Sequence, residues 1–147
     1  MEIHMSFPYN TPTLMNPFKQ AFLFTGGVLV IHGILLLTGG YRIPQIDVPM
    51  HLLGGFAMAL FGLAIHHTVS TSYHTKHSPV WYHYTFVVGF AILIGVAWEF
   101  HEYILDNTIN IWYNFPKSQP SLGDTMKDFF NDWIVASIAF YFFKKNG

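Results

Sequence analysis

The sequence predicts an all-α integral membrane protein in which four transmembrane helices form an up-down bundle. Only 10% of its 147 residues are charged and 52% are hydrophobic, whereas about 25% of the residues in a soluble domain are charged. Three long stretches contain no Asp, Glu, Lys or Arg, and each can hold the roughly 20 apolar residues that cross a bilayer. These stretches lie between Lys19 and Arg42, between Asp47 and Lys76, and between Lys76 and Glu99.

Composition also excludes several functional classes. The chain contains no cysteine, which excludes a disulfide scaffold, a thiolate metal site and a cysteine nucleophile. A formal net charge of −1 leaves no excess positive charge to neutralise phosphates, so we do not expect a nucleic acid as partner. We interpret residues 1–147 as one membrane domain, with residues 1–16 as a short N-terminal extension.

Local signals justify each helix in turn. The four helices are expected at about 18–38, 50–70, 80–104 and 124–143. Their start signals are N-cap and proline pairs or a capping box: Asn16-Pro17, Asp47-Val48-Pro49, Ser78-Pro79 and the stretch from Ser121 to Asp124. Gly39-Gly40 is expected to end the first helix and Asn107 the third.

The first and fourth helices need a separate argument. Acidic Glu2 precedes the first helix and Lys19 is the only basic residue before its apolar core, so we interpret it as a retained span rather than a cleavable signal. In the fourth helix only Trp133 to Phe143 is free of charge. Its first two turns are therefore expected at the interface or against protein, because acids inside a membrane need partners.

Four spans place both termini on the same side of the membrane. That side would carry Lys19, Lys76, Lys144 and Lys145, against Arg42, Lys117 and Lys127 on the other. The positive-inside rule then favours cytoplasmic termini in a prokaryotic cytoplasmic membrane. The expected partners are the lipid bilayer and either other membrane subunits or further copies of the chain.

The acidic residues converge on one end of the predicted bundle, which this topology places at the outer face. They sit at the start of the second helix, the end of the third and the start of the fourth, with spacings that keep each group on one helix face. The groups are Asp47 with His51; Glu99, Glu102 and Asp106; and Asp124, Asp128 and Asp132.

Crowded carboxylates in a medium of low dielectric constant cannot all ionise without a cation. We therefore expect a divalent metal (Mg, Mn, Fe or Zn) and no organic cofactor, because carboxylates with one imidazole are hard to borderline ligands. The candidate ligands are Glu99, Glu102, Asp124, Asp128 and His51. His51 would be a ligand or general base, and Asp47 would orient the ligands. For Asp47, Asp106 and Asp124 taken singly, helix capping is the alternative.

The other histidines leave several interpretations open. Five of them surround the second loop at the opposite end, where they could form a polar interfacial ring or a second metal site: His66, His67, His74, His77 and His83. His32 lies inside the first helix, where burial against a neighbour and a proton relay are both open. His101 is expected to pack away from the face that carries Glu99 and Glu102.

Three short motifs carry a resemblance to a known group. They are Asp47-x3-His51-x2-Gly54-Gly55, Trp98-Glu99-x2-Glu102-x3-Asp106 and Asp124-Thr125-x2-Asp128-x3-Asp132. Over about residues 20–143 the chain resembles the YjdF-like group of small predicted bacterial membrane proteins and, more loosely, VanZ-like proteins. The resemblance implies a fold of packed membrane helices. The recurring acids of the group would correspond to Asp47, Glu99, Glu102, Asp124 and Asp128.

Three functional hypotheses follow, and the sequence leaves open whether the protein is an enzyme. The first is a carboxylate/histidine metal site whose activated water performs hydrolytic or transferase chemistry on a lipid headgroup. The second is a small transporter or proton-coupling protein, with Glu99, Glu102 and His32 along a polar path. The third is a structural subunit of a larger membrane complex, in which the acids cap helices or bind a basic loop of a partner.

Overall fold

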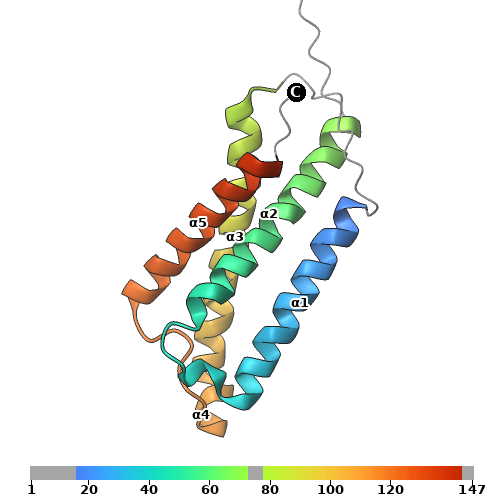
Figure 1. The fold of residues 1–147 in the computed structure, drawn as a ribbon. Coiled ribbons are helices and arrows are strands. Elements are labelled where there is room, and N and C mark those ends of the chain that lie inside the picture. The colour runs from blue at the N-terminus through green and yellow to red at the C-terminus, as the bar shows by residue number, and fades with distance from the viewer. Residues whose placement is uncertain (1–15, 73–77, 144–147) are drawn as a thin grey trace, which may run out of the picture.

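The computed structural model describes residues 16–72 and 78–143, and within these ranges every regular element is helical (Figure 1). The elements in chain order are α1 (Pro17–Thr38), the 3-10 helix η1 (Gly40–Arg42), α2 (Asp47–Ser72), α3 (Val80–Asn107), α4 (Ile109–Tyr113) and α5 (Leu122–Phe143). The all-α prediction is confirmed for this part of the chain. The short elements η1 and α4 were not expected, and both lie in the connections at the lower end of Figure 1.

Most of the expected helix boundaries agree with the structure. The Asn16 side chain caps α1 by accepting a hydrogen bond from the Phe18 amide at 2.9 Å. Gly39 ends that helix in the left-handed conformation at φ 71°, which glycine adopts at no steric cost. At the start of α5, Ser121 Oγ accepts from the Asp124 amide at 3.2 Å, as expected for a capping serine.

Two expected boundaries need correction. Helix α2 begins at Asp47 and not near residue 50, because Pro49 fits within the first helical turn, where no intrahelical N–H bond is lost. The N-cap of α3 is Pro79, which has no side chain that could cap the helix. Ser78 is therefore not the capping residue; its carbonyl instead accepts a hydrogen bond from His83 Nε2 at 2.8 Å.

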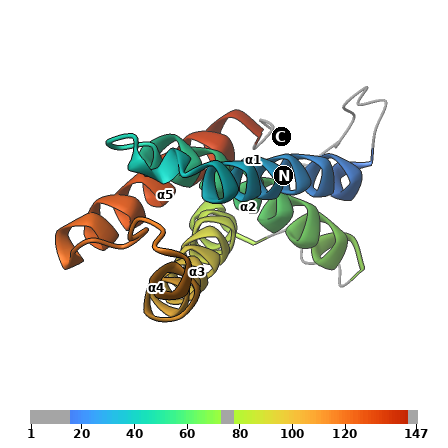
Figure 2. The same ribbon diagram turned by 90° about the horizontal axis from the view of Figure 1, so that it is seen from below.

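Helix α2 is the centre of the bundle and contacts α1, α3 and α5, while α3 also contacts α5. Seen from below, α1 lies at one edge and α3 with α4 at the opposite edge (Figure 2). Small side chains let these backbones approach closely, as in other membrane bundles. The buried cluster at the α2–α3–α5 contact consists of Ala59, Val87, Val88, Ala91, Ala136, Ala139 and Phe140.

Within the described residues, three helices are long and apolar enough to cross a membrane: Pro17–Thr38, Asp47–Ser70 and Val80–Asn107. The predicted count of four spans is therefore supported only for the first three. Among the described residues, α5 does not meet the same criterion, and charged residues occupy its first two turns. Large apolar side chains such as Leu37, Leu93 and Tyr141 are more than half exposed, which suits contact with lipid chains.

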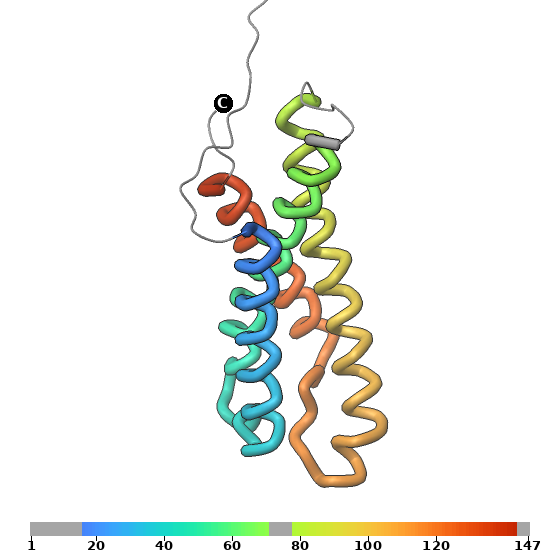
Figure 3. The backbone as a smooth tube through the Cα atoms, turned by 90° about the vertical axis from the view of Figure 1, so that its right-hand side faces the viewer, coloured from blue at the N-terminus to red at the C-terminus, as the bar shows by residue number. Residues whose placement is uncertain are grey.

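The path of the chain brings the acidic helix ends together. In Figure 1, α1 and α3 run toward the lower end, while α2 and α5 run upward, and α5 begins well above the end of α3. Figure 3 shows the segment between α4 and α5 returning alongside α3 before α5 begins. The start of α2, the end of α3 and the start of α5 are consequently neighbours.

Candidate metal centre

Three side chains from three helices meet at the acidic end of the bundle. His51 of α2, Glu99 of α3 and Asp128 of α5 each offer one ligand atom, and these atoms lie within 4.8 Å of one another. His51 Nε2 is 3.5 Å from Glu99 Oε1 and 3.8 Å from Asp128 Oδ2. The three residues are 5%, 5% and 2% exposed. The structure thus brings together three of the five predicted ligands in a buried position.

Two of the atoms that face one another in this group, His51 Nε2 and Glu99 Oε1, have no hydrogen bond to any described residue. Asp128 faces His51 with Oδ2, and its other oxygen, Oδ1, is buried without a hydrogen bond to the described residues and lies 3.9 Å from Lys127 Nζ. An unsatisfied buried polar atom costs about 1–3 kcal/mol, and more when it is charged. One imidazole nitrogen and two carboxylates pointing at a common space are a donor set that suits a divalent cation.

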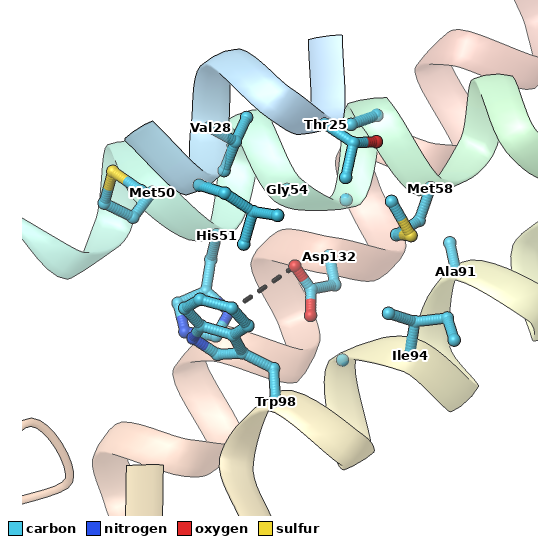
Figure 4. Close-up of a pocket in the computed structure, with 14 residues that line it drawn as sticks. Thr25, Val28, Met50, His51, Gly54, Met58, Ala91, Ile94, Trp98 and Asp132 are labelled. Atoms are coloured by element: carbon cyan, nitrogen blue, oxygen red, sulfur yellow. Dashed lines mark ion pairs between the residues drawn. The ribbon is translucent and has the colours of Figure 1, made fainter. Parts of the chain in front are cut away.

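Asp132, one turn beyond Asp128 on α5, holds the other side of the histidine ring. Its Oδ1 lies 3.5 Å from His51 Nδ1, the pair drawn as a dashed line in Figure 4. A carboxylate at Nδ1 favours the tautomer that carries its proton there, which leaves the Nε2 lone pair free for a metal. Asp132 was not among the predicted site residues, although its i, i+4 spacing from Asp128 was a signal for it.

Two glycines make room for this aspartate. A Cβ atom on Gly95 of α3 would overlap the Asp132 carboxylate, and one on Gly55 of α2 would lie 3.1 Å from Asp132 Oδ1 and 2.7 Å from Val135 Cγ1. Only glycine at these two positions lets α5 place Asp132 between α2 and α3.

A loop residue, Gln119, holds the candidate ligand Glu99 in place. Gln119 Nε2 donates hydrogen bonds to Glu99 Oε2 at 2.7 Å and to Thr125 Oγ1 at 2.8 Å. This arrangement occupies one oxygen of Glu99 and leaves Oε1 directed at His51. Gln119 was missed at the sequence level, because a glutamine in an irregular loop carries no periodic signal that relates it to a helix twenty residues earlier.

Asp106 anchors the loop that carries Gln119. Its carboxylate accepts hydrogen bonds from the amides of Ser118 and Gln119, both at 2.8 Å, and from Asn110 Nδ2 at 2.6 Å. Asp106 is 6% exposed, so these bonds satisfy a buried carboxylate. Its function is to fasten a loop, which differs from the helix capping that was considered for it.

Asp47 and Asp124, the other predicted residues of α2 and α5, form a second group with Asp128. Lys127 Nζ lies between them, 2.8 Å from Asp47 Oδ2 and 2.6 Å from Asp124 Oδ1. An ammonium group bonded to both carboxylates already compensates part of their charge, so this group has less need of a metal. In the His51 group the same ammonium approaches only Asp128, at 3.9 Å, and within the described part of the chain it forms no hydrogen bond or ion pair with His51 or Glu99.

Glu102, the remaining predicted ligand, lies outside both groups. Its Oε1 accepts a hydrogen bond from Trp98 Nε1 at 3.0 Å, and the Trp98 ring contacts the His32 ring at a centroid distance of 4.7 Å. His32 Nδ1 is in turn 2.5 Å from the Tyr41 hydroxyl. Burial, together with the nearby carboxylates of Glu102 and Asp47, raises the pKa of Tyr41 well above its usual value, so this hydroxyl stays protonated at neutral pH.

The charges of the cluster need compensation. Four carboxylates that are at most 5% exposed, those of Glu99, Glu102, Asp128 and Asp132, surround the single histidine His51. Even a protonated imidazole would leave a formal excess of negative charge in a medium that solvates it poorly. A divalent cation between His51, Glu99 and Asp128 would compensate half of the formal charge of the four carboxylates.

The histidines of the opposite end form a different arrangement. His66 Nε2 is 2.6 Å from His83 Nδ1, and His83 Nε2 donates to the Ser78 carbonyl. Both nitrogens of His83 are therefore engaged in hydrogen bonds, which fits a polar ring better than a second metal site. His74 and His77 lie outside the described residues. His101 contacts the rings of Trp98 and His32, as expected for a packing residue.

Comparison with known proteins gives one match. A family model described as "Predicted membrane protein (DUF2238)" matches residues 11–146. No curated protein and no solved structure matches the chain. The match supports the expected kind of protein, a membrane protein, and does not extend to the YjdF-like or VanZ-like groups.

Proposed function

This chain belongs to the DUF2238 family of predicted membrane proteins, and we propose that it binds a divalent cation through His51, Glu99 and Asp128. The single observation that supports this proposal is the buried meeting of ligand atoms from α2, α3 and α5, in which the facing atoms His51 Nε2 and Glu99 Oε1 have no hydrogen bond among the described residues. A packed interior rarely leaves facing polar atoms unsatisfied unless another group binds them.

The donor set narrows the class of metal. One imidazole and two carboxylates suit Zn, Mn or Fe better than Mg, which prefers oxygen ligands alone, and they disfavour copper(I). Three protein ligands with one coordination position left open are typical of catalytic rather than structural zinc sites. The roles expected for Glu102 and Asp124 as ligands, and for Asp47 as an orienting or catalytic residue, remain predictions.

We place hydrolytic or transferase chemistry on a lipid headgroup at this site. A bound divalent ion would supply a Lewis acid and a water molecule of lowered pKa. The protein would supply the rest: Asp132 holds the His51 tautomer, Gln119 holds Glu99, and Asp128 completes the donor set. The cluster is near one end of two candidate spans, so in a bilayer it would lie at the depth where headgroups meet hydrocarbon.

Metal analysis of the purified protein tests the proposal. Wild-type protein in detergent should contain close to one divalent ion per chain, and Glu99→Gln and Asp128→Asn should lose it. His101→Gln is the matched control, because it removes an imidazole from α3 outside the cluster. Full metal occupancy in both carboxylate variants, or none in the wild type, would refute the site.

The two alternative functions make different demands on the structure. A proton or solute path would need polar groups along the bundle, and among the described residues the apolar cluster around Val87 and Ala91 separates the acidic end from the His66–His83 pair. A purely structural subunit would not require the unpaired atoms of His51 and Glu99. Both observations favour the metal site.

The membrane placement is part of the same proposal. We propose that α5 completes the bundle as a fourth span, with Asp124 and Lys127 at the interface and Trp133 to Phe143 in the hydrocarbon. Both termini would then be cytoplasmic and the metal cluster would face outward.

A further inference from the structure

A cavity of about 190 Å³ begins at the metal cluster and extends into the bundle (Figure 4). His51, Trp98 and Asp132 line one end of it, and Thr25, Met58 and Ala91 line the other. Between these ends the walls are apolar, and they belong to α1, α2 and α3. On α2 the lining runs from Met50 to Met58, which corresponds to about 12 Å along a helix axis.

The cavity is elongated in the direction in which membrane lipids lie. Its lining descends α1 from Thr25 to Leu29 and α3 from Ala91 to Trp98, so it follows the axes of two candidate spans. Its polar end is the end at which the metal cluster lies, and its apolar end points toward the middle of the hydrocarbon. A molecule with a polar head and an apolar chain would match this polarity.

The cavity is open on the side of α1. That helix packs on α2 and makes only sparse contact with α3, which includes the ring contact between His32 and Trp98. Leu29 lines the cavity and is also 51% exposed, so the lining continues to the outer surface. Since α1 and α3 are both candidate spans, this opening would face lipid chains rather than water.

We propose that this cavity holds the hydrocarbon chain of a membrane lipid, which enters between α1 and α3 and brings the headgroup to His51 and the metal cluster. The proposal rests on the proposed function for the headgroup chemistry and names its substrate class. Apolar cavities of comparable size, about 150 Å³, stay dry and bind apolar ligands. The surrounding bilayer supplies such a ligand directly.

Gly54 provides a way to fill the cavity without disturbing the helix contacts. It lines the cavity, and a Cβ atom on it would meet nothing within 4 Å. Gly54→Leu should therefore occupy the space that the chain would take. Gly89→Leu is the matched control, because Gly89 also has no neighbour within 4 Å of a Cβ atom and lies outside the cavity.

The test measures whether lipid chains reach Trp98. In a protein whose other tryptophans (Trp81, Trp112 and Trp133) are replaced by phenylalanine, Trp98 fluorescence is compared in vesicles of phosphatidylcholine with ordinary and with brominated acyl chains. Quenching by brominated chains should be strong in the parent and in Gly89→Leu, and most of it should be lost in Gly54→Leu. Equal quenching in all three proteins would overturn the proposal.

Two additions keep the test decisive. Val28→Phe fills the same cavity from α1, so it replaces Gly54→Leu if the latter does not fold, and it should also lose the quenching. Polyprenyl phosphate added to the brominated vesicles distinguishes chain types: relief of quenching means that an isoprenoid chain takes the cavity, and no relief means that the acyl chain keeps it. Metal content is measured in parallel on the same proteins. Unchanged quenching in a protein that binds metal would refute the lipid cavity alone, and loss of metal binding with the expected quenching would refute the metal site alone.

Discussion

At the scale of single residues, His51 has two nitrogens in different environments. Nδ1 lies beside Asp132, while Nε2 faces Glu99 and Asp128 without a hydrogen bond. A carboxylate behind a metal-binding imidazole fixes the tautomer and makes the ring a stronger ligand. The residue that orients the histidine is thus Asp132 in this geometry, whereas Asp47 is paired with Lys127.

The first prediction concerns Asp132→Asn. The asparagine keeps the volume of the side chain and loses its charge, so the metal should still bind but with an affinity lowered by about 10–100-fold. Competition with a chelator of known affinity measures this change in the detergent-solubilised protein. His101→Gln should leave the affinity unchanged, and an unchanged affinity in Asp132→Asn would show that Asp132 does not act through His51.

At the scale of elements, the site depends on how closely three helices approach. Gly55 and Gly95 give α5 the space to insert Asp132 between α2 and α3. The loop before α5 adds a second constraint, because Asp106 binds its backbone and Gln119 reaches Glu99. Helix contacts and a fastened loop together set the positions of the three candidate ligands, His51, Glu99 and Asp128.

The second prediction concerns Gly95→Ala. The new methyl group would overlap the Asp132 carboxylate, and overpacking of this kind costs about 1–3 kcal/mol. We expect a lower midpoint of thermal unfolding in detergent and weaker metal binding. Gly89→Ala, on the same helix but with open space around it, should show neither effect; equal behaviour of the two variants would contradict the close contact.

At the scale of the whole molecule, the buried polar groups lie at the two ends of the bundle, and its middle is apolar. The acidic cluster lies at the end that carries η1 and α4, and the His66–His83 pair lies at the other end. The apolar cluster of α2, α3 and α5 fills the space between them. This segregation fits a chain whose middle is surrounded by lipid and whose ends meet water.

The third prediction concerns the orientation in the membrane. The chain has no cysteine, so a single cysteine introduced at an exposed position is the only thiol that a maleimide can label. Suitable exposed positions are Ile43, Tyr113 and Val80. A membrane-impermeant maleimide added to intact cells should label Ile43→Cys and Tyr113→Cys, and it should label Val80→Cys only after the membrane is opened. Labelling of all three from one side would contradict the bundle, and the opposite pattern would reverse its orientation.

The sequence by itself determined the class of protein and most of the helices. Scarce charge predicted membrane helices, and proline, asparagine and glycine signals located the first helix almost to the residue, because these effects act within a few residues. The positions of the acids, at the start of the second helix, the end of the third and the start of the fourth, also predicted which end of the bundle collects them. These properties follow from local geometry and from the cost of placing charge in hydrocarbon.

Only the tertiary structure decided which atoms meet. The rotation of α2, α3 and α5 about their axes makes His51, Glu99 and Asp128 neighbours. It also pairs Asp47 with Lys127 and lets Glu102 accept a hydrogen bond from Trp98. The roles of Asp132 and Gln119 depend on helix approach and loop path, which periodicity within one helix does not specify. The cavity beside the cluster exists only because three helices leave space between them, and that is a property of their packing rather than of any one segment.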